Sequence, residues 1–225
     1  MEKVKKGLLW FFHSFIWLGV LLLVVDIVTK SVVIANKDYI LSQPNQRIDL
    51  IPGFLGISYL INTNAAFGIG LGNALVNRIV YIVLAVLVSA VLIAVYVKKF
   101  DKLNKLYKAC LMMILVGAVG NLIDRVFYTV DYLKSAEVGV VDWIDFYGIW
   151  RYVFNIADSS IVIGVIMLIV VLIVEEVLDR KKQNAIMVAA KKNETPAEEA
   201  KEESKEEAKV EEEPKAEEKD SKEEK

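Results

Sequence analysis

The stretch IVYIVLAVLVSAVLIAVYV at residues 79–97 decides the fold class, because it is 19 residues long and carries no charge. A helix of that length rises about 30 Å, the thickness of the hydrocarbon layer of a membrane. We therefore expect a transmembrane helix here. Such a sequence excludes a soluble enzyme whose whole surface faces water.

Three further apolar runs lie before and after this stretch, and polar residues interrupt or end each of them. The predicted transmembrane spans are residues 7–26, 77–97, 107–124 and 156–178. The first run continues into VVDIVTK without a small-residue cleavage site, so we expect it to be retained and not removed as a signal peptide. The predicted fold class is a membrane all-α protein, a bundle of four transmembrane helices.

Lysine and arginine indicate the orientation of the four spans. Basic clusters precede the first span, separate the second from the third, and follow the fourth: Lys3, Lys5, Lys6, Lys98, Lys99, Lys102, Lys105, Lys108, Arg180, Lys181 and Lys182. Four spans place all three clusters on one side, and basic loops favour the cytoplasm. We expect both termini to be cytoplasmic and residues 31–76 and 125–155 to be extracytoplasmic.

The two extracytoplasmic segments differ in composition. Residues 31–76 contain the β-branched stretches RIDLIPGF and LGISYLIN, broken by proline and glycine. This pattern predicts a few short strands that form a small extracytoplasmic β-rich cap. Residues 125–155 are rich in tryptophan and tyrosine, and we expect them to lie along the outer interface of the membrane.

The charged residues concentrate at the C-terminal end. The chain is 55% hydrophobic and 25% charged, and its mean hydropathy is +0.42. From Lys191 to Lys225 there are 9 Lys and 15 Asp or Glu, which leaves a basic body with a net charge of +4. We expect one membrane domain over residues 1–184. Residues 185–225 form a charged cytoplasmic tail, expected to be disordered or a fluctuating, solvated helix.

Two scarce residue types restrict the chemistry further. Cys110 is the single cysteine, which excludes a disulfide scaffold, and His13 is the single histidine, which excludes a His-rich metal site. Attention therefore falls on carboxylates within or beside the spans, where ionisable side chains are costly and mark function by default. In DIVTK, Asp26 and Lys30 are four residues apart, and a structural ion pair on one helix face is the favoured interpretation.

The segment GAVGNLIDR at residues 117–125 places small and polar residues on one helical stripe. Gly117 and Gly120 allow another helix to approach closely. Packing alone does not explain Asn121, Asp124 and Arg125 on the same face. We interpret this stripe as part of a functional site.

Two aspartates near the outer membrane surface complete the pattern. Asp142 in VVDWID carries little information alone, because an extramembrane carboxylate is usually solvated. In FNIADSS, Asn155 is a candidate helix cap, and Asp158 would then be the third helical residue. The chemistry of a helix start therefore explains both residues as well as a role in a functional site does. Two carboxylates brought together at a dry interface cannot both ionise easily, and one would act as base toward water. That is aspartic-protease chemistry.

Five segments taken in order resemble the lipoprotein signal peptidases, or signal peptidase II, a family of bacterial membrane aspartic proteases. The segments are DIVTK (26–30), NTNAAF (62–67), GAVGNLIDR (117–125), VVDWID (140–145) and FNIADSS (154–160). The resemblance spans roughly residues 18–180. It implies a substrate in which a prolipoprotein signal peptide is cut just before a cysteine carrying a diacylglyceryl group.

The resemblance also implies roles for individual residues. Catalytic roles go to Asp142 and Asp158, substrate-binding roles to Asn62, Asn121, Arg125 and Asn155, and supporting roles to Asp26, Lys30, Asp124 and Gly120. Because Asp124 is a carboxylate close to this pair, an acid–base role in place of Asp142 stays open for it, and Asn64 stands where the family usually has glycine. Asn tolerates positive φ, so the turn there is expected to survive.

The same resemblance implies the setting in which the chain works. We expect no cofactor and no metal, membrane lipids and the lipidated substrate as partners, no nucleic acid, and a monomer. The expected location is the bacterial cytoplasmic membrane, with the active site toward its outer face. Two rival classes remain: an ion-coupled transporter that uses the same acids, which would need polar groups leading to the midplane, and a membrane scaffold, which leaves the five segments unexplained.

Overall fold

The computed structural model describes residues 2–64, 70, 73–127 and 139–212. Within the chain, Met1–Val171 and Leu172–Lys225 form two compact units. The candidate site lies entirely in the first unit. Part of the segment NTNAAF, residues 65–67, and residues 128–138 of the aromatic segment lie outside the described residues.

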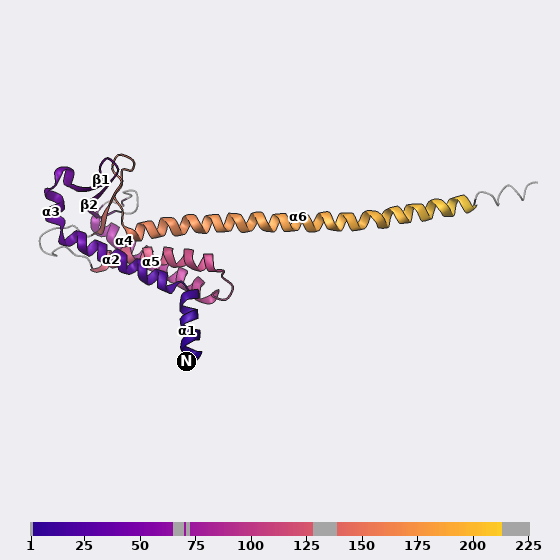
Figure 1. Ribbon diagram of the computed structural model, residues 1–225, viewed down its shortest axis with the longest axis horizontal. Coiled ribbons are helices and arrows are strands. Elements are labelled where there is room, and N and C mark those ends of the chain that lie inside the picture. Colours follow the sequence, from indigo (N-terminus) through magenta and orange to yellow (C-terminus); the bar gives the residue numbers. More distant parts are fainter. Residues whose placement is uncertain (1, 65–69, 71–72, 128–138, 213–225) are drawn as a thin grey trace, which may run out of the picture. The chain divides into compact units, whose positions relative to one another are not determined.

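Among the described residues, four helices are long and apolar enough to cross a membrane: Ile16–Ala35, Leu75–Lys98, Lys105–Phe127 and Ile156–Val188. They belong to α2 (Ile16–Ala35), α4 (Ala74–Lys98), α5 (Lys105–Phe127) and α6 (Ile156–Glu212). Helix α5 packs against both α2 and α4 (Figure 1). A cluster of Tyr96, Leu111, Met112 and Val116 fills the space among these three helices. The predicted number of four spans agrees with these helices, and the last three begin close to the predicted residues.

The predicted first span, residues 7–26, is wrong at both ends. A short helix α1 (Glu2–His13) stops before it, and α2 begins only at Ile16. The break has a local cause, because Phe15 adopts the left-handed conformation with φ 57°. At the other end α2 continues past Asp26, because that carboxylate is paired inside the bundle and does not need water.

The cap is a three-stranded antiparallel sheet in the order β1-β2-β3, built from β1 (Arg47–Ile51), β2 (Leu55–Asn62) and β3 (Val140–Asp145). A short helix α3 (Lys37–Ser42) and a 3-10 turn η1 (Pro44–Gln46) lead from α2 into it. Val33, Ile40 and Val141 form a buried cluster beneath the sheet. The strands predicted in residues 31–76 are confirmed.

Strand β3 was not expected. Residues 125–155 were predicted to lie along the membrane interface, but Val140–Asp145 pairs with β2 along most of its length. The reason is burial, because Val140 and Val141 are almost inaccessible to solvent and Val141 belongs to the buried cluster with Val33 and Ile40. This pairing brings the second extracytoplasmic segment onto the first.

The charged tail of residues 185–225 was predicted to be disordered or a solvated helix. Helix α6 continues through it as far as Glu212, so the helical alternative describes residues 185–212. Residues 213–225 lie outside the described residues. Residues 185–212 are helical because Glu, Lys and Ala are strong helix formers.

Candidate functional site

Asp142 occupies the middle of β3 and is fully buried. Both carboxylate oxygens accept a hydrogen bond from a carboxamide: Oδ2 from Asn62 Nδ2 at 3.0 Å, and Oδ1 from Asn155 Nδ2 at 2.7 Å. Asn62 reaches it because Asn62 of β2 pairs with Val140, which puts Asn62 and Asp142 on one face of the sheet, diagonally opposed. The sheet register therefore fixes one side of the site.

Asn155 and Asp158 begin α6, and each caps the other's backbone. The Asp158 amide donates to Asn155 Oδ1 at 2.8 Å, and the Asn155 amide donates to Asp158 Oδ2 at 3.3 Å. This is the reciprocal geometry of a capping box. The predicted cap is confirmed, with Asp158 as the third helical residue.

The start of α6 is also tied to β3. Phe154 forms a bridge with Ile144, and its carbonyl accepts from the Trp143 and Ile144 amides at 3.0 and 2.7 Å. Asn155, the next residue, is thereby held against Asp142. Strand β3 and the start of α6 are both distant from β2 in sequence. Together with β2 they bring Asp142 and Asp158 to one place.

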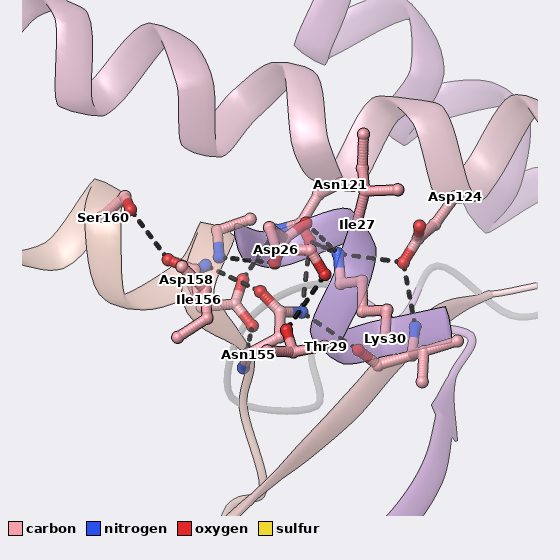
Figure 2. A network of polar contacts seen from close by, with 12 residues as sticks. Asp26, Ile27, Thr29, Lys30, Asn121, Asp124, Asn155, Ile156, Asp158 and Ser160 are labelled. Atoms are coloured by element: carbon pink, nitrogen blue, oxygen red, sulfur yellow. Dashed lines mark hydrogen bonds and ion pairs between the residues drawn. The ribbon is translucent and has the colours of Figure 1, made fainter. Parts of the chain in front are cut away.

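Asn121 of α5 connects Asp158 to a buried lysine (Figure 2). Its Nδ2 donates to Asp158 Oδ1 at 2.7 Å, and its Oδ1 accepts from Lys30 Nζ at 3.3 Å and from Asn155 Nδ2 at 3.2 Å. An ammonium group can only donate, so the Asn121 oxygen must face Lys30 and its nitrogen must face Asp158. Lys30 therefore sets the orientation of this carboxamide.

Lys30 is itself held between two aspartates, with Asp26 Oδ2 at 2.7 Å and Asp124 Oδ2 at 3.0 Å (Figure 2). Asp26 Oδ1 accepts from the Ala157 amide at 2.9 Å, and Asp124 Oδ2 accepts from the Val141 amide at 3.1 Å. The structural ion pair predicted for Asp26 and Lys30 is confirmed. It extends to Asp124 and reaches both elements that carry Asp142 and Asp158.

Gly117 and Gly120 allow α2, α5 and α6 to meet at this point. A Cβ on Gly120 would lie 2.8 Å from Asp26 Oδ2 and 3.0 Å from Ala157 Cβ, and one on Gly117 would meet the Ala157 carbonyl oxygen. The close helix approach predicted for these glycines is confirmed. It brings the ion triad of Asp26, Lys30 and Asp124 against the first turn of α6.

Arg125 lies beside the site and binds two backbone carbonyls. Its guanidinium donates to Asn121 O at 3.3 Å and to Asn64 O at 3.2 Å, and lies 5.4 Å from the centre of the Tyr81 ring. All ten residues singled out from the sequence thus lie in or beside one network: Asp26, Lys30, Asn62, Gly120, Asn121, Asp124, Arg125, Asp142, Asn155 and Asp158.

Sequence reasoning missed the contribution of α4. This helix begins at Ala74, so Asn77 and Arg78 belong to it. Asn77 Nδ2 donates to Asn64 Oδ1 at 2.9 Å, and Arg78 Nε donates to Arg125 O at 2.7 Å. The sequence feature that could have revealed this contribution is the polar pair Asn77 and Arg78, directly before the apolar run 79–97.

Asn64 does not need the positive φ that glycine would allow, because it is not among the described residues with that conformation. Its amide instead donates to Asn62 Oδ1 at 3.0 Å, which forms a tight side-chain-to-backbone turn. Asn64 therefore preserves the turn by hydrogen bonding, and it orients Asn62 so that the Nδ2 group faces Asp142.

The electrostatic state of Asp142 follows from this burial. Loss of solvent and, after it, the nearby Asp158 carboxylate raise the pKa of Asp142 to about 7, against the hydrogen bonds from Asn62 and Asn155. An ordinary aspartate is ionised at neutral pH. Asp142 can hold a proton there, so the pair can contain one acid and one base.

Comparison with known proteins gives consistent matches to one family. The family model described as signal peptidase (SPase) II matches residues 18–174, a range that contains the cap and all ten site residues. A lipoprotein signal peptidase of Fusobacterium nucleatum subsp. nucleatum is 34% identical over 154 residues, which cover 68% of this chain and 82% of that protein. One from Actinobacillus succinogenes is 34% identical over 168 residues, covering 74% and 90%.

A solved structure is similar as well. A bacterial membrane enzyme determined by the in meso method at 2.3 Å resolution superposes with a TM-score of 0.57 at 28% identity. The match covers 72% of this chain and 88% of that chain. The likeness therefore extends over most of the solved enzyme.

Proposed function

Because the chain belongs to the signal peptidase II family, we propose that it is an aspartic endopeptidase in which Asp142 and Asp158 form the catalytic pair. It is a membrane protease that removes signal peptides from prolipoproteins. The aspartic mechanism, the position of the cut and the roles of the site residues are the proposal.

The observation that carries the proposal is the pair of hydrogen bonds from Asn155 to both aspartates. Its side chain donates to Asp142, while its backbone amide donates to Asp158. One residue therefore holds two carboxylates from β3 and α6 side by side in a buried site. Such a pair is suited to share one proton, which is the arrangement that aspartic proteases use.

The surroundings suggest which aspartate carries that proton at rest. Asp158 lies in the first turn of α6, where the helix dipole favours a negative charge, and it accepts the hydrogen bond that Lys30 orients through Asn121. Asp142 lies in a strand and has its pKa raised to about 7 by burial. We assign the resting proton to Asp142 and the negative charge to Asp158.

Catalysis then follows in two steps. Asp158 takes a proton from water, the resulting oxygen nucleophile bonds to the scissile carbonyl carbon, and Asp142 donates its proton to the carbonyl oxygen. In the second step Asp142 recovers the proton from the tetrahedral intermediate, the C–N bond breaks, and Asp158 gives its proton to the leaving amine. Both residues return to their starting states.

The remaining site residues divide between orientation and binding. The side chains of Asn62, Asn121 and Asn155 each donate to one of the aspartates, so we propose that they orient the catalytic pair as well as contact substrate. Arg125 is the candidate for binding substrate carbonyl or ester oxygens. Asp124 faces Lys30 and the Val141 amide, which favours a supporting role over a competing acid–base role.

The proposed substrate is a prolipoprotein whose cysteine already carries a diacylglyceryl group, cut just before that cysteine. Such a substrate is a membrane helix with an attached lipid, and it would reach the site from the bilayer. Both termini are proposed to be cytoplasmic, with the site toward the outer face, because the lysine clusters lie at the opposite ends of the spans.

The test uses detergent-purified protein and a diacylglyceryl-modified peptide that spans the cleavage site. Asp142→Asn and Asp158→Asn should each reduce the cleavage rate by roughly 10²–10⁴-fold, the usual contribution of an acid–base group. Asp145→Asn is the matched control, because Asp145 ends the same strand but binds Ser58 and Arg47. Full activity in folded Asp158→Asn protein would exclude the catalytic pair.

A further inference from the structure

The helix α1 ends at a break whose freed carbonyl groups are bound by side chains. The Ser14 hydroxyl donates to Phe11 O at 2.7 Å, Trp17 Nε1 donates to Phe12 O at 3.3 Å, and the Tyr96 hydroxyl donates to Ser14 O. Ser14 is fully buried. Unpaired backbone groups are costly in or near a bilayer, so these donors allow the chain to turn there. The sequence therefore specifies the break.

Beyond the break, α1 does not extend the membrane span. Helix α2 has 20 residues and is long enough to cross by itself. Figure 1 shows α1 leaving the end of α2 at a steep angle. Trp10 packs against Phe100, which follows α4, with the ring centroids 5.8 Å apart. This contact holds α1 at one end of the bundle.

One side of α1 is apolar and exposed. Val4, Leu8, Phe11 and Phe12 recur at the spacing that places residues on one face of a helix. Val4, Leu8 and Phe12 are 75%, 57% and 53% exposed. Trp10, which contacts Phe100, lies on a different side of the helix. The four residues form an apolar stripe along α1.

The same end of the bundle is strongly basic. Residues 1–13 and 98–108 contain eight lysines and only two acidic residues, Glu2 and Asp101. Glu2 is already paired with Lys6 at 2.9 Å. Lys108 lies over the Phe100 ring at 3.7 Å, which places positive charge next to the contact made by Trp10. The positive charge at this end of the bundle is complementary to a negatively charged surface.

We infer that α1 is an interfacial helix that lies along the surface of an anionic bilayer. The apolar stripe enters the boundary between headgroups and acyl chains, and the lysines bind anionic headgroups. The occupant is the membrane surface itself, because an anionic bilayer complements both the exposed apolar stripe and the lysines that lie at the same end of the bundle. The match to the family model begins at residue 18, so α1 lies outside the residues that this model matches.

The test measures the depth of two nitroxide labels on the full chain in vesicles of phosphatidylglycerol and phosphatidylethanolamine. Cys110, the only cysteine and fully buried, is first replaced by alanine. The labels are then placed at Leu8→Cys, in the stripe, and at Lys6→Cys, away from it. The label at position 8 should lie about 5–10 Å below the headgroups, accessible to oxygen and shielded from an aqueous relaxant, whereas the label at position 6 should show the reverse. Equal exposure of both labels to the aqueous relaxant would overturn the inference.

Two further arms distinguish an anionic lipid surface from a neutral one and from a second protein molecule. Replacing phosphatidylglycerol by phosphatidylcholine, or introducing Lys5→Gln, should move the label at position 8 toward water. An unchanged depth in both cases would contradict the role of anionic lipid. Dilution with unlabelled protein should leave the depth unaltered, and a dependence on dilution would show that a second copy of the chain covers the stripe. With the label kept at position 8, the matched pair Val4→Gln and Leu9→Gln should differ, with loss of insertion only in the former.

Discussion

Asn155 and Asp158 exchange two hydrogen bonds across the first turn of α6, from each backbone amide to the other's side chain, at 3.3 and 2.8 Å. The residues that begin this helix are also those placed at the site. From the sequence, helix-start chemistry and a functional role were competing interpretations of FNIADSS. In the fold one arrangement serves both, because a side chain that caps α6 is thereby fixed in position beside Asp142.

The two roles of Asn155 can be separated by substitution. Serine is as good a cap as asparagine but lacks the amide group that donates to Asp142, whereas alanine lacks both groups. Asn155→Ser should retain most of the stability and Asn155→Ala should lose about 1 kcal/mol more. Both should lose most of the cleavage activity. Thermal unfolding in detergent and cleavage of a lipidated peptide give the two readouts; a fully active serine variant would contradict the positioning role.

Lys30 neutralises two buried carboxylates, so its removal should be among the most damaging single changes. Lys30→Met leaves Asp26 and Asp124 without their cation and should destabilise the protein by roughly 3–5 kcal/mol. Lys182→Met is the control, because the Lys182–Asp179 pair is exposed and should contribute no more than about 1 kcal/mol. Denaturant unfolding of both variants measures the difference. Similar losses would mean that the triad adds no stability.

A second effect of Lys30 concerns catalysis. Without the ammonium group, the Asn121 oxygen keeps only the Asn155 Nδ2 donor at 3.2 Å, so the carboxamide is held less firmly with its nitrogen toward Asp158. The triple variant that also carries Asp26→Asn and Asp124→Asn should recover part of the lost stability but not the activity. Recovery of both together would assign Lys30 a purely structural role.

The pH dependence follows from the raised pKa of Asp142. The proposed resting state needs a proton on Asp142, so the cleavage rate should fall as pH rises through about 7. A steady-state pH profile with lipidated peptide measures this. A rate that is constant from pH 6 to pH 9 would contradict the assignment of the proton to Asp142.

Stability should respond to pH with the same sign. The folded-state pKa of Asp142 lies above its ordinary value of 3.8, so between about 4 and 7 the native state binds more protons than the unfolded state. The free energy of unfolding should therefore decrease as pH rises across this window. Asp142→Asn cannot titrate and should show a smaller decrease, which melting temperatures at pH 5 and pH 8 can test.

Apolar runs and turn residues were sufficient to predict the four spans and the first two strands. The break at Phe15 was missed because no proline or glycine marks it, and its stability depends on Tyr96, which is distant in sequence. Strand β3 was missed because six residues carry too little periodicity, and the pairing partner decides its conformation. Long-range pairing is the common cause of both failures.

The candidate site shows the same division. Ionisable residues within apolar runs identified the members of the network, because burial makes such residues expensive. The hydrogen bonds between these residues could not be predicted from the cost of burial. The orientation of Asn121 depends on Lys30, 91 residues away, and the hydrogen bond from Asn62 to Asp142 depends on the sheet register.

The glycines of α5 provide the last test, since they determine how closely α6 can approach. A Cβ on Gly117 would meet the Ala157 carbonyl oxygen and the Ile161 side chain, whereas a Cβ on Gly7 in α1 has nothing within 4 Å. Gly117→Ala should destabilise the protein by about 1–3 kcal/mol and reduce cleavage, because displacing the first turn of α6 moves Asp158 relative to Asp142. Gly7→Ala should be neutral or slightly stabilising, since alanine is the better helix former. Thermal unfolding and peptide cleavage of the two variants measure both effects, and equal behaviour would show that α5 and α6 tolerate a wider separation than the packing indicates.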